Sequence, residues 1–268
     1  MNFDGSITST SNPRVKALAR IRAGKGAEDD SILIDGLREI GRAASAGVEL
    51  LEAFFCPGIA KPDWETVLER CRKNGAKCIE VTEPVLERIS YGDRRDGLIV
   101  TAVRPCRRLT ELDLSSTALV AVLEGIEKPG NLGAILRSAD GAGVDAIIIA
   151  DAATDLYGSN VIRASTGIIF SMPVYEATAA EVRSLLQSRD IQLAAAAPEA
   201  NLLYTEVDFR KPTAVILGSE ARGLTSTWRD SAVITAKIPM HGKADSLNVA
   251  TTAALFFYEA RRQRGMLE

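Results

Sequence analysis

The sequence is poor in histidine, cysteine and aromatic residues, and these shortages argue against several kinds of site. The 268 residues include one histidine, four cysteines and 5% aromatic side chains. The cysteines, Cys56, Cys71, Cys78 and Cys106, are irregularly spaced in the first 106 residues. We therefore expect reduced thiols, with neither a zinc site nor a disulfide framework. No metal is expected to take part in the function.

Long hydrophobic runs and phosphate-binding glycine motifs are also missing. No apolar stretch approaches the roughly 20 residues of a membrane-spanning helix, and the N-terminus lacks the layout of a signal peptide. We therefore expect a cytoplasmic protein with no membrane partner. Neither G-x-x-x-x-G-K-[ST] nor G-x-G-x-x-G after a strand occurs, which disfavours a P-loop site and a nicotinamide-dependent oxidoreductase. A serine hydrolase using Ser246 and His241 would need an orienting carboxylate, and the chain has no G-x-S-x-G elbow.

A net charge of −3 conceals a basic cluster near the N-terminus. Against Asp4 alone, residues 1–25 carry the basic side chains Arg14, Lys16, Arg20, Arg22 and Lys25. A local basic patch on a neutral domain suffices for contacts with phosphate groups. On charge alone a solvated helix face is an equally good explanation.

Alternating strand and helix patterns predict two α/β domains. Asn12-Pro13 is typical of a helix start, with Arg14, Lys16 and Arg20 on its outer face. The following strands are expected at 32–35, 50–56, 77–81 and 98–103, with helices at 37–46, 64–73 and 84–89. A proline-containing polar stretch at 104–117 is the candidate linker. The expected domains are therefore residues 1–106 and 118–268, with residues 107–117 between them.

In the second domain, the continuous apolar runs at 118–123 and 146–150 are typical of parallel strands buried on both faces. Further strands are expected at 168–173, 192–196, 213–217 and 233–238. Helices are expected at 131–142, 179–188 and 248–264.

Three polar segments interrupt these apolar elements. In the first, Asn131 is expected to start a helix and to face the same crevice as Arg137. The second is Gly218-Ser219-Glu220 with Arg222 and Gly223, and the third runs from Ile238-Pro239-Met240 to Ser246-Leu247-Asn248. Purely structural explanations also exist: Asn131 as a helix cap, Arg137 in an ion pair, Glu220 in a solvated turn, and Ser246 or Asn248 as a cap.

Taken together, the segments resemble the three motifs of the SpoU/TrmH family of RNA ribose 2′-O-methyltransferases, in the SPOUT superfamily. The matching stretches are N-x-G-x-x-x-R at 131–137, L-G-S-E-x-x-G-L at 217–224, and I-P-M…S-L-N-V at 238–249. The resemblance covers residues 118–262. The segment from Arg163 to Gly167 is similar to the family's V-R-A-S-x-G, and residues 7–16 resemble the start of its L30e-like accessory domain.

The resemblance implies an α/β trefoil-knot methyltransferase domain behind a smaller L30e-like RNA-binding domain. It also implies a homodimer formed through the C-terminal domain, with S-adenosylmethionine bound in the knot. Cofactor contacts are implied for Leu217, Gly218, Ile238, Met240, Ser246 and Leu247. The implied catalytic set is Asn131, Arg137, Glu220, Ser246 and Asn248, and the implied RNA contacts are Arg14, Lys16, Arg20 and Arg163.

The chemistry of these side chains limits the roles that the resemblance implies. A guanidinium is effectively always protonated, so we interpret Arg137 as a phosphate clamp and a stabiliser of developing alkoxide charge. Glu220 is expected to orient neighbouring groups, and the group that accepts the ribose proton stays open.

Large-subunit ribosomal RNA is the expected substrate, because the accessory domain resembles a ribosomal protein. The alternatives are methylation of transfer RNA and a non-catalytic RNA-binding protein of the same fold.

Overall fold

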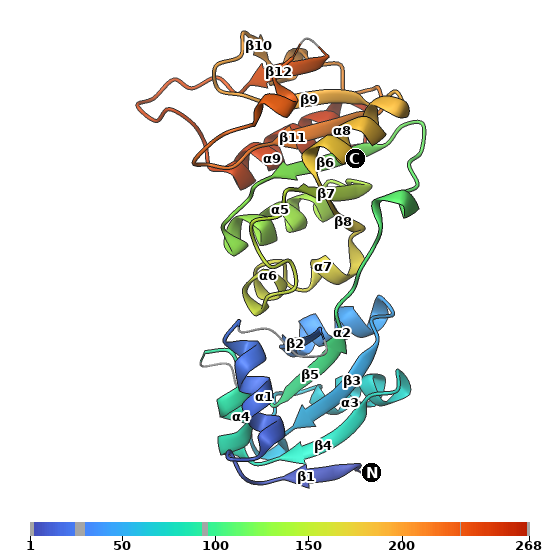
Figure 1. Cartoon of the computed structure of the whole chain (residues 1–268), viewed down its shortest axis with the longest axis vertical. Coiled ribbons are helices and arrows are strands. Elements are labelled where there is room, and N and C mark those ends of the chain that lie inside the picture. The colour runs from blue at the N-terminus through green and yellow to red at the C-terminus, as the bar shows by residue number, and fades with distance from the viewer. Residues whose placement is uncertain (1–2, 25–29, 93–95, 231, 267–268) are drawn as a thin grey trace. The chain divides into compact units, whose positions relative to one another are not determined.

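The chain forms two compact units in a computed structural model that describes residues 3–24, 30–92, 96–230 and 232–266. The N-terminal unit consists of Met1–Pro105 together with Leu156–Ser171. The C-terminal unit consists of Cys106–Asp155 and Met172–Glu268 (Figure 1). In the described part of the chain, no helix is both long and apolar enough to cross a membrane.

The N-terminal unit contains a five-stranded mixed sheet in the order β1-β4-β3-β5-β2. Strand β5 runs antiparallel to both of its neighbours, whereas β1, β4 and β3 are parallel to one another. The strands are β1 (Gly5–Ile7), β2 (Ser31–Asp35), β3 (Leu50–Phe55), β4 (Lys77–Val81) and β5 (Leu98–Val103).

Helices α1 (Pro13–Arg22) and α4 (Glu83–Ile89) cover one face of this sheet. Asn12 caps α1 as predicted, because its Oδ1 accepts a hydrogen bond from the Arg14 backbone N–H at 2.9 Å. Val15 and Leu18 of α1 are buried in a cluster with Leu33, Phe54 and Ile79 of the strands. Helices α2 (Leu37–Ser45) and α3 (Trp64–Lys73) pack together; α2 contacts β2 and β5, and α3 contacts β3 and β4.

The segment Leu156–Ser171 contains two short helices, α6 (Ser159–Ala164), which contacts β2, and α7 (Ile168–Ser171), which contacts α2. Arg42 of α2 donates to the carbonyl and the hydroxyl of Thr166, at 2.6 and 2.7 Å. The strand predicted at 168–173 is therefore wrong. Its apolar residues are all buried, and a short buried apolar run does not distinguish a strand from a helical turn.

The C-terminal unit is built on a seven-stranded sheet in the order β10-β12-β9-β11-β6-β7-β8, and every pairing is parallel. The strands are β6 (Leu119–Glu124), β7 (Ala146–Ala150), β8 (Val174–Ala177), β9 (Gln192–Ala196), β10 (Leu202–Leu203), β11 (Thr213–Leu217) and β12 (Val233–Lys237). Strands β6, β7 and β11 are buried along their whole length, which confirms the interpretation of the apolar runs that form β6 and β7.

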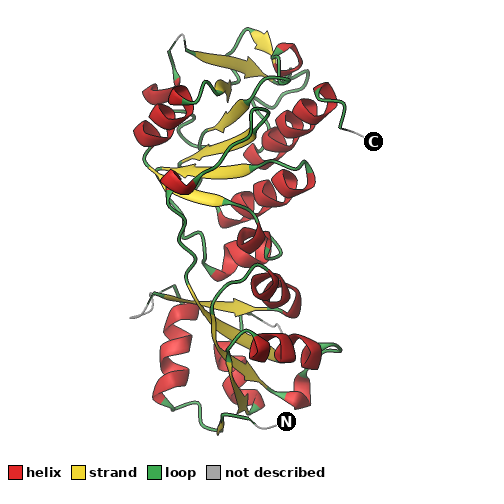
Figure 2. Ribbon diagram, turned by 90° about the vertical axis from the view of Figure 1, so that its right-hand side faces the viewer, coloured by secondary structure: helices red, strands yellow, loops and turns green. Residues whose placement is uncertain are grey.

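Helices cover both faces of this sheet (Figure 2). Helix α8 (Ala179–Ser188) packs on one face, where its Val182 and Leu186 join a cluster with Val122 and Ile216. Helices α5 (Pro129–Gly141) and α9 (Val249–Gln263) pack against each other, and α9 contacts β11. Because parallel strands share one direction, their carboxyl ends lie along one edge of the sheet, where ligands bind in open α/β sheets.

Candidate active site

The loops that follow β9, β11 and β12 line one cavity of about 710 Å³. These strands are neighbours in the sheet, which is why loops far apart in the sequence meet there. All six residues predicted to contact a cofactor line this cavity: Leu217, Gly218, Ile238, Met240, Ser246 and Leu247. The third loop, Ala196-Ala197-Pro198, was missed by the sequence analysis, although a proline soon after a strand could have indicated it.

The loop after β11 is a tight turn that excludes a side chain at its first position. A Cβ on Gly218 would lie 2.4 Å from the backbone carbon of Gly223 and 2.7 Å from the nitrogen of Leu224. The Gly223 N–H donates to the Ser219 carbonyl at 2.9 Å, and Gly223 has a φ of +64°. Glycine is needed at 218 because of the loop's own backbone, and at 223 because of the left-handed conformation.

Glu220, in the second motif, connects all three motifs through its side chain. Its Oε1 accepts hydrogen bonds from Asn131 Nδ2 at 2.8 Å and Asn248 Nδ2 at 2.9 Å. The Asn248 amide also lies 3.1 Å from Asn131 Oδ1, while its own Oδ1 accepts from the Ala250 N–H and caps α9. Asn248 therefore acts both as a helix cap and as a member of this cluster. Glu220, Ser246 and Asn248 line the cavity of the cofactor-site candidates.

Lys128, at the start of α5, forms an ion pair with Glu220 of this cluster. Its ammonium donates to Glu220, and this hydrogen bond, with a further one from Asn131, lowers the pKa of the Glu220 carboxyl. The same contact raises the pKa of Lys128. An ordinary glutamate is already ionised at neutral pH, so these contacts stabilise the ionised carboxylate further, and this stabilisation is lost as the pH falls through the lowered pKa. The sequence analysis missed Lys128, although its position three residues before Asn131 could have indicated that it belongs to this cluster.

The start of α5 differs from the prediction. The helix begins at Pro129, so Asn131 lies within its first turn and uses its side chain to contact Glu220. Six residues of helix leave about 120° between the directions of Asn131 and Arg137, and that both side chains serve one site stays a prediction. Arg137 is exposed, lines neither the cavity nor the small pocket beside Asn131, and has no hydrogen-bonding or ionic partner among the described residues.

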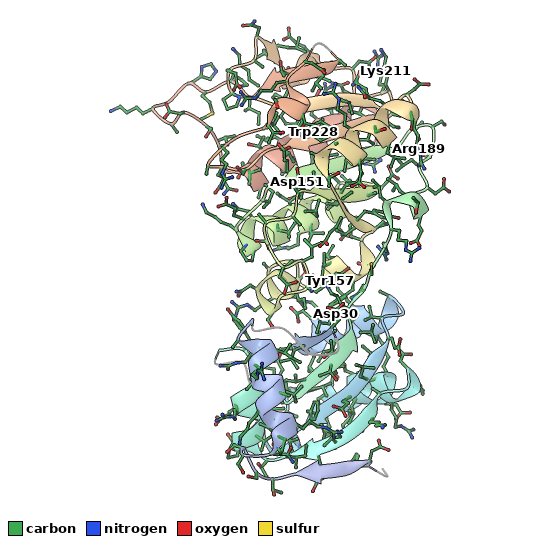
Figure 3. The ribbon with its side chains drawn as sticks, in the orientation of Figure 1. Asp30, Asp151, Tyr157, Arg189, Lys211 and Trp228 are labelled. Carbon is green, nitrogen blue, oxygen red and sulfur yellow. The ribbon has the colours of Figure 1, made fainter. Side chains whose placement is uncertain are left out.

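A buried carboxylate that the sequence analysis missed holds the chain just after the β11 loop. Glu124, the last residue of β6, is 3% exposed. Its oxygens accept from the Thr225 N–H at 2.8 Å, the Thr225 hydroxyl at 2.7 Å and the Trp228 indole N–H at 3.0 Å. Trp228, labelled in Figure 3, is fully buried in the C-terminal unit. Glu124 thus fixes the position of the loop that ends at Leu224.

The predicted RNA-contacting residues have different environments in the N-terminal unit. Arg14 pairs with Glu52 at 3.1 Å, whereas Lys16 and Arg20 are exposed and have no partner among the described residues. The guanidinium of Arg163 stacks 4.4 Å from the centre of the Tyr91 ring.

The structure describes one of the two remaining basic side chains of the cluster. Arg22 donates to the Ser90 carbonyl at the end of α4, and Lys25 lies outside the described residues. Within the described part of the chain, no three His, Cys, Asp or Glu side chains are grouped so as to hold a metal ion.

Comparison with known proteins identifies the family. The model of the SpoU rRNA Methylase family matches residues 118–258, and that of the MRM3-like substrate binding domain matches residues 12–100. The chain therefore belongs to the SpoU rRNA methylase family. A 23S rRNA (guanosine-2′-O-)-methyltransferase from Xylella fastidiosa is 35% identical over 74% of this chain and 83% of its own length.

Solved structures of other proteins are similar to this one over nearly the whole chain. An RNA 2′-O ribose methyltransferase is 43% identical, with a TM-score of 0.82, covering 97% of this chain and 99% of the other. An AdoMet-bound rRNA methyltransferase from Sinorhizobium meliloti is 28% identical, with a TM-score of 0.86, covering 96% and 97%. The C-terminal unit has the α/β SPOUT fold that the resemblance predicted, and a separate N-terminal unit precedes it.

Proposed function

We propose that the protein transfers a methyl group from S-adenosylmethionine to a ribose 2′-hydroxyl of large-subunit ribosomal RNA. The observation that carries the proposal is the convergence of three motif segments, distant in sequence, on one cavity with Asn131, Glu220 and Asn248 joined by hydrogen bonds. The 23S rRNA activity of the Xylella relative supports the choice of RNA.

The cavity fits S-adenosylmethionine in size and in character. Its volume of about 710 Å³ lies within the range of small-molecule sites, roughly 300–1,000 Å³. The lining combines apolar side chains, among them Leu224, Met240 and Phe256, with the loop backbone at Gly218, Ile238 and Leu247. These three residues would hold the cofactor, which supplies an electrophilic methyl group when bound. The AdoMet-bound relative supports the assignment.

Positioning of the ribose is the main contribution that we assign to the polar cluster. Methyl transfer forms an oxygen–carbon bond and breaks a carbon–sulfur bond in line, so the hydroxyl must be held in one orientation. Glu220 fixes the two asparagine amides, which can in turn orient a ribose. Glu220 already accepts several hydrogen bonds and its lowered pKa makes it a weaker base, so we do not assign it as the acceptor of the ribose proton.

Arg137 and Arg163 receive separate roles. Exposed and without a described partner, Arg137 is available to bind the phosphate next to the target ribose and to stabilise alkoxide charge. Arg163 has its guanidinium face on Tyr91, which leaves its N–H edge for RNA. We also propose, from the family resemblance, that the protein is a cytoplasmic homodimer formed through the C-terminal unit.

The decisive experiment measures transfer of labelled methyl from S-adenosylmethionine to separate 23S ribosomal RNA and transfer RNA pools, with chelator present. We expect labelling of 23S RNA, and mapping of alkali-resistant 2′-O-methyl positions should place it at one nucleotide. Labelling of transfer RNA alone would overturn the choice of substrate. Binding of both RNA and cofactor without transfer would support the non-catalytic alternative.

A truncated chain that begins near Arg107 tests the division of labour. We expect it to bind cofactor and to methylate RNA poorly, because the N-terminal unit would select the RNA. Light scattering of both chains should show a dimer, and a monomer in either case would contradict the assignment of the dimer contact to the C-terminal unit.

A further inference from the structure

The N-terminal unit contains a second cavity, also of about 710 Å³, on the sheet face that α1 partly covers. Leu18 and Leu50 contribute apolar surface to it. Its charged lining residues are Arg14, Arg20, Glu49, Glu52 and Lys77. We call this cavity the α1 groove. None of the three motifs of the C-terminal unit extends to it.

The polar residues of the α1 groove form a row across neighbouring strands. Lys77 of β4 pairs in register with Glu52 of β3, and Glu52 pairs with Thr101 of β5. Side chains two residues apart on a strand share a face, so this row continues the face that buries Phe54 and Ile79 under α1. The sheet therefore exposes a polar surface where its helical cover ends.

The charges of the α1 groove are mixed, and this limits what it can bind. Arg20 and Lys77 are exposed, as contacts with phosphate require. Glu49 and Glu52 would repel a phosphate, and the ion pair of Glu52 with the half-exposed Arg14 contributes little to stability. Carboxylates among cations suit a ligand that carries both an anionic group and an amino donor.

An RNA nucleotide whose base has an exocyclic amino group has this combination. Single-stranded RNA exposes the hydrogen-bonding edges of its bases, and carboxylates accept from the N4 amino group of cytosine. Uracil has a carbonyl oxygen at that position, which a carboxylate repels.

We propose that the α1 groove binds an unpaired RNA nucleotide, with Arg20 and Lys77 on its phosphates and Glu52 accepting from the amino group of its base. The inference rests on the proposed RNA substrate and adds base selection by the N-terminal unit. Arg14 then holds the Glu52 carboxylate in place across the groove.

The test compares labelled oligocytidine and oligouridine of equal length, binding to the full chain without cofactor and measured by fluorescence anisotropy. We expect cytidine to bind about 5- to 100-fold more tightly, as one good base contact provides. Glu52→Gln should bring this ratio close to one. Glu52→Gln should not weaken binding of oligouridine, because the substitution also releases Arg14 from its ion pair with Glu52.

Glu80→Gln is the matched control, because Glu80 is an exposed glutamate of β4 that does not line the groove. It should leave the ratio unchanged. A wild-type ratio of one, or a ratio that survives Glu52→Gln, would overturn the proposal. If methyl is transferred but the affinities for oligocytidine and oligouridine are equal, only this inference fails. If the affinities differ as expected but no methyl is transferred, only the proposed function fails.

Discussion

The two cavities have the same volume but are built from different parts of the chain. The cavity of the C-terminal unit is formed by loops whose glycine and asparagine residues fix the backbone. In the α1 groove, long charged side chains from a helix and several strands form the walls. A site built on loop backbone leaves short sequence motifs, whereas a site built from dispersed side chains leaves almost none. This explains why only the first could be predicted residue by residue.

The largest effect is expected from a substitution of Arg137. It tests whether the residues that line the cavity of the C-terminal unit are sufficient for activity. Arg137→Ala should lower turnover about 100- to 1,000-fold, the loss typical when a charge-stabilising group is removed. Calorimetry should show affinity for S-adenosylhomocysteine unchanged within a few-fold, because Arg137 does not line the cavity. Near-normal turnover would show that the active site has been assigned wrongly.

Gly218→Val should weaken cofactor binding by about 100-fold, because the added Cβ collides with the backbone of the loop and forces it to move. Oligonucleotide binding by the N-terminal unit should not change. Gly242→Ala is the matched control, since no atom lies within 4 Å of a Cβ built there. If calorimetry showed equal losses for both variants, backbone crowding would not be the cause.

Glu124→Gln tests the buried support of the same cavity. The amide NH2 would face N–H and O–H donors, so the free energy of unfolding should fall by about 1–3 kcal/mol. Trp228 fluorescence in a Trp64→Phe background reports unfolding of the C-terminal unit in urea. Glu176→Gln, at an exposed position of β8, should have almost no effect. An equal loss in both variants would argue against the Glu124 network.

The smallest effect is expected on the α1 groove. Arg20→Ala should weaken oligonucleotide binding a few-fold and lower the slope of log affinity against log salt by about one. Lys16→Ala removes the same charge from the same helix at a position outside the groove and should change less. If Arg20→Ala and Lys16→Ala had equal effects on binding, α1 would contribute only its overall positive charge and no contact specific to the groove.

Much of the fold could be predicted from the sequence because its strands are unusually apolar. The expected bounds of β4, β5, β7, β9 and β11 agree with the structure to the residue. Short elements were missed or misassigned, including β1, β8 and the helical segment at 168–171. A run of only a few residues is too short to show a clear hydrophobic periodicity. The segment Leu156–Ser171 also packs with the N-terminal unit, which no local pattern indicates.

The sequence by itself determined the family, the two α/β units and six residues that line the cavity of the C-terminal unit. These depend on local chemistry: glycine where backbone crowds, asparagine where a helix begins, and apolar runs where strands are buried. Tertiary structure decided which side chains meet. Glu124 reaches Trp228, Lys128 reaches Glu220, and Lys77 lies beside Glu52 only because strand order brings distant segments together. Hydrogen bonds and ion pairs act over a few ångströms in space, and sequence separation does not report that distance.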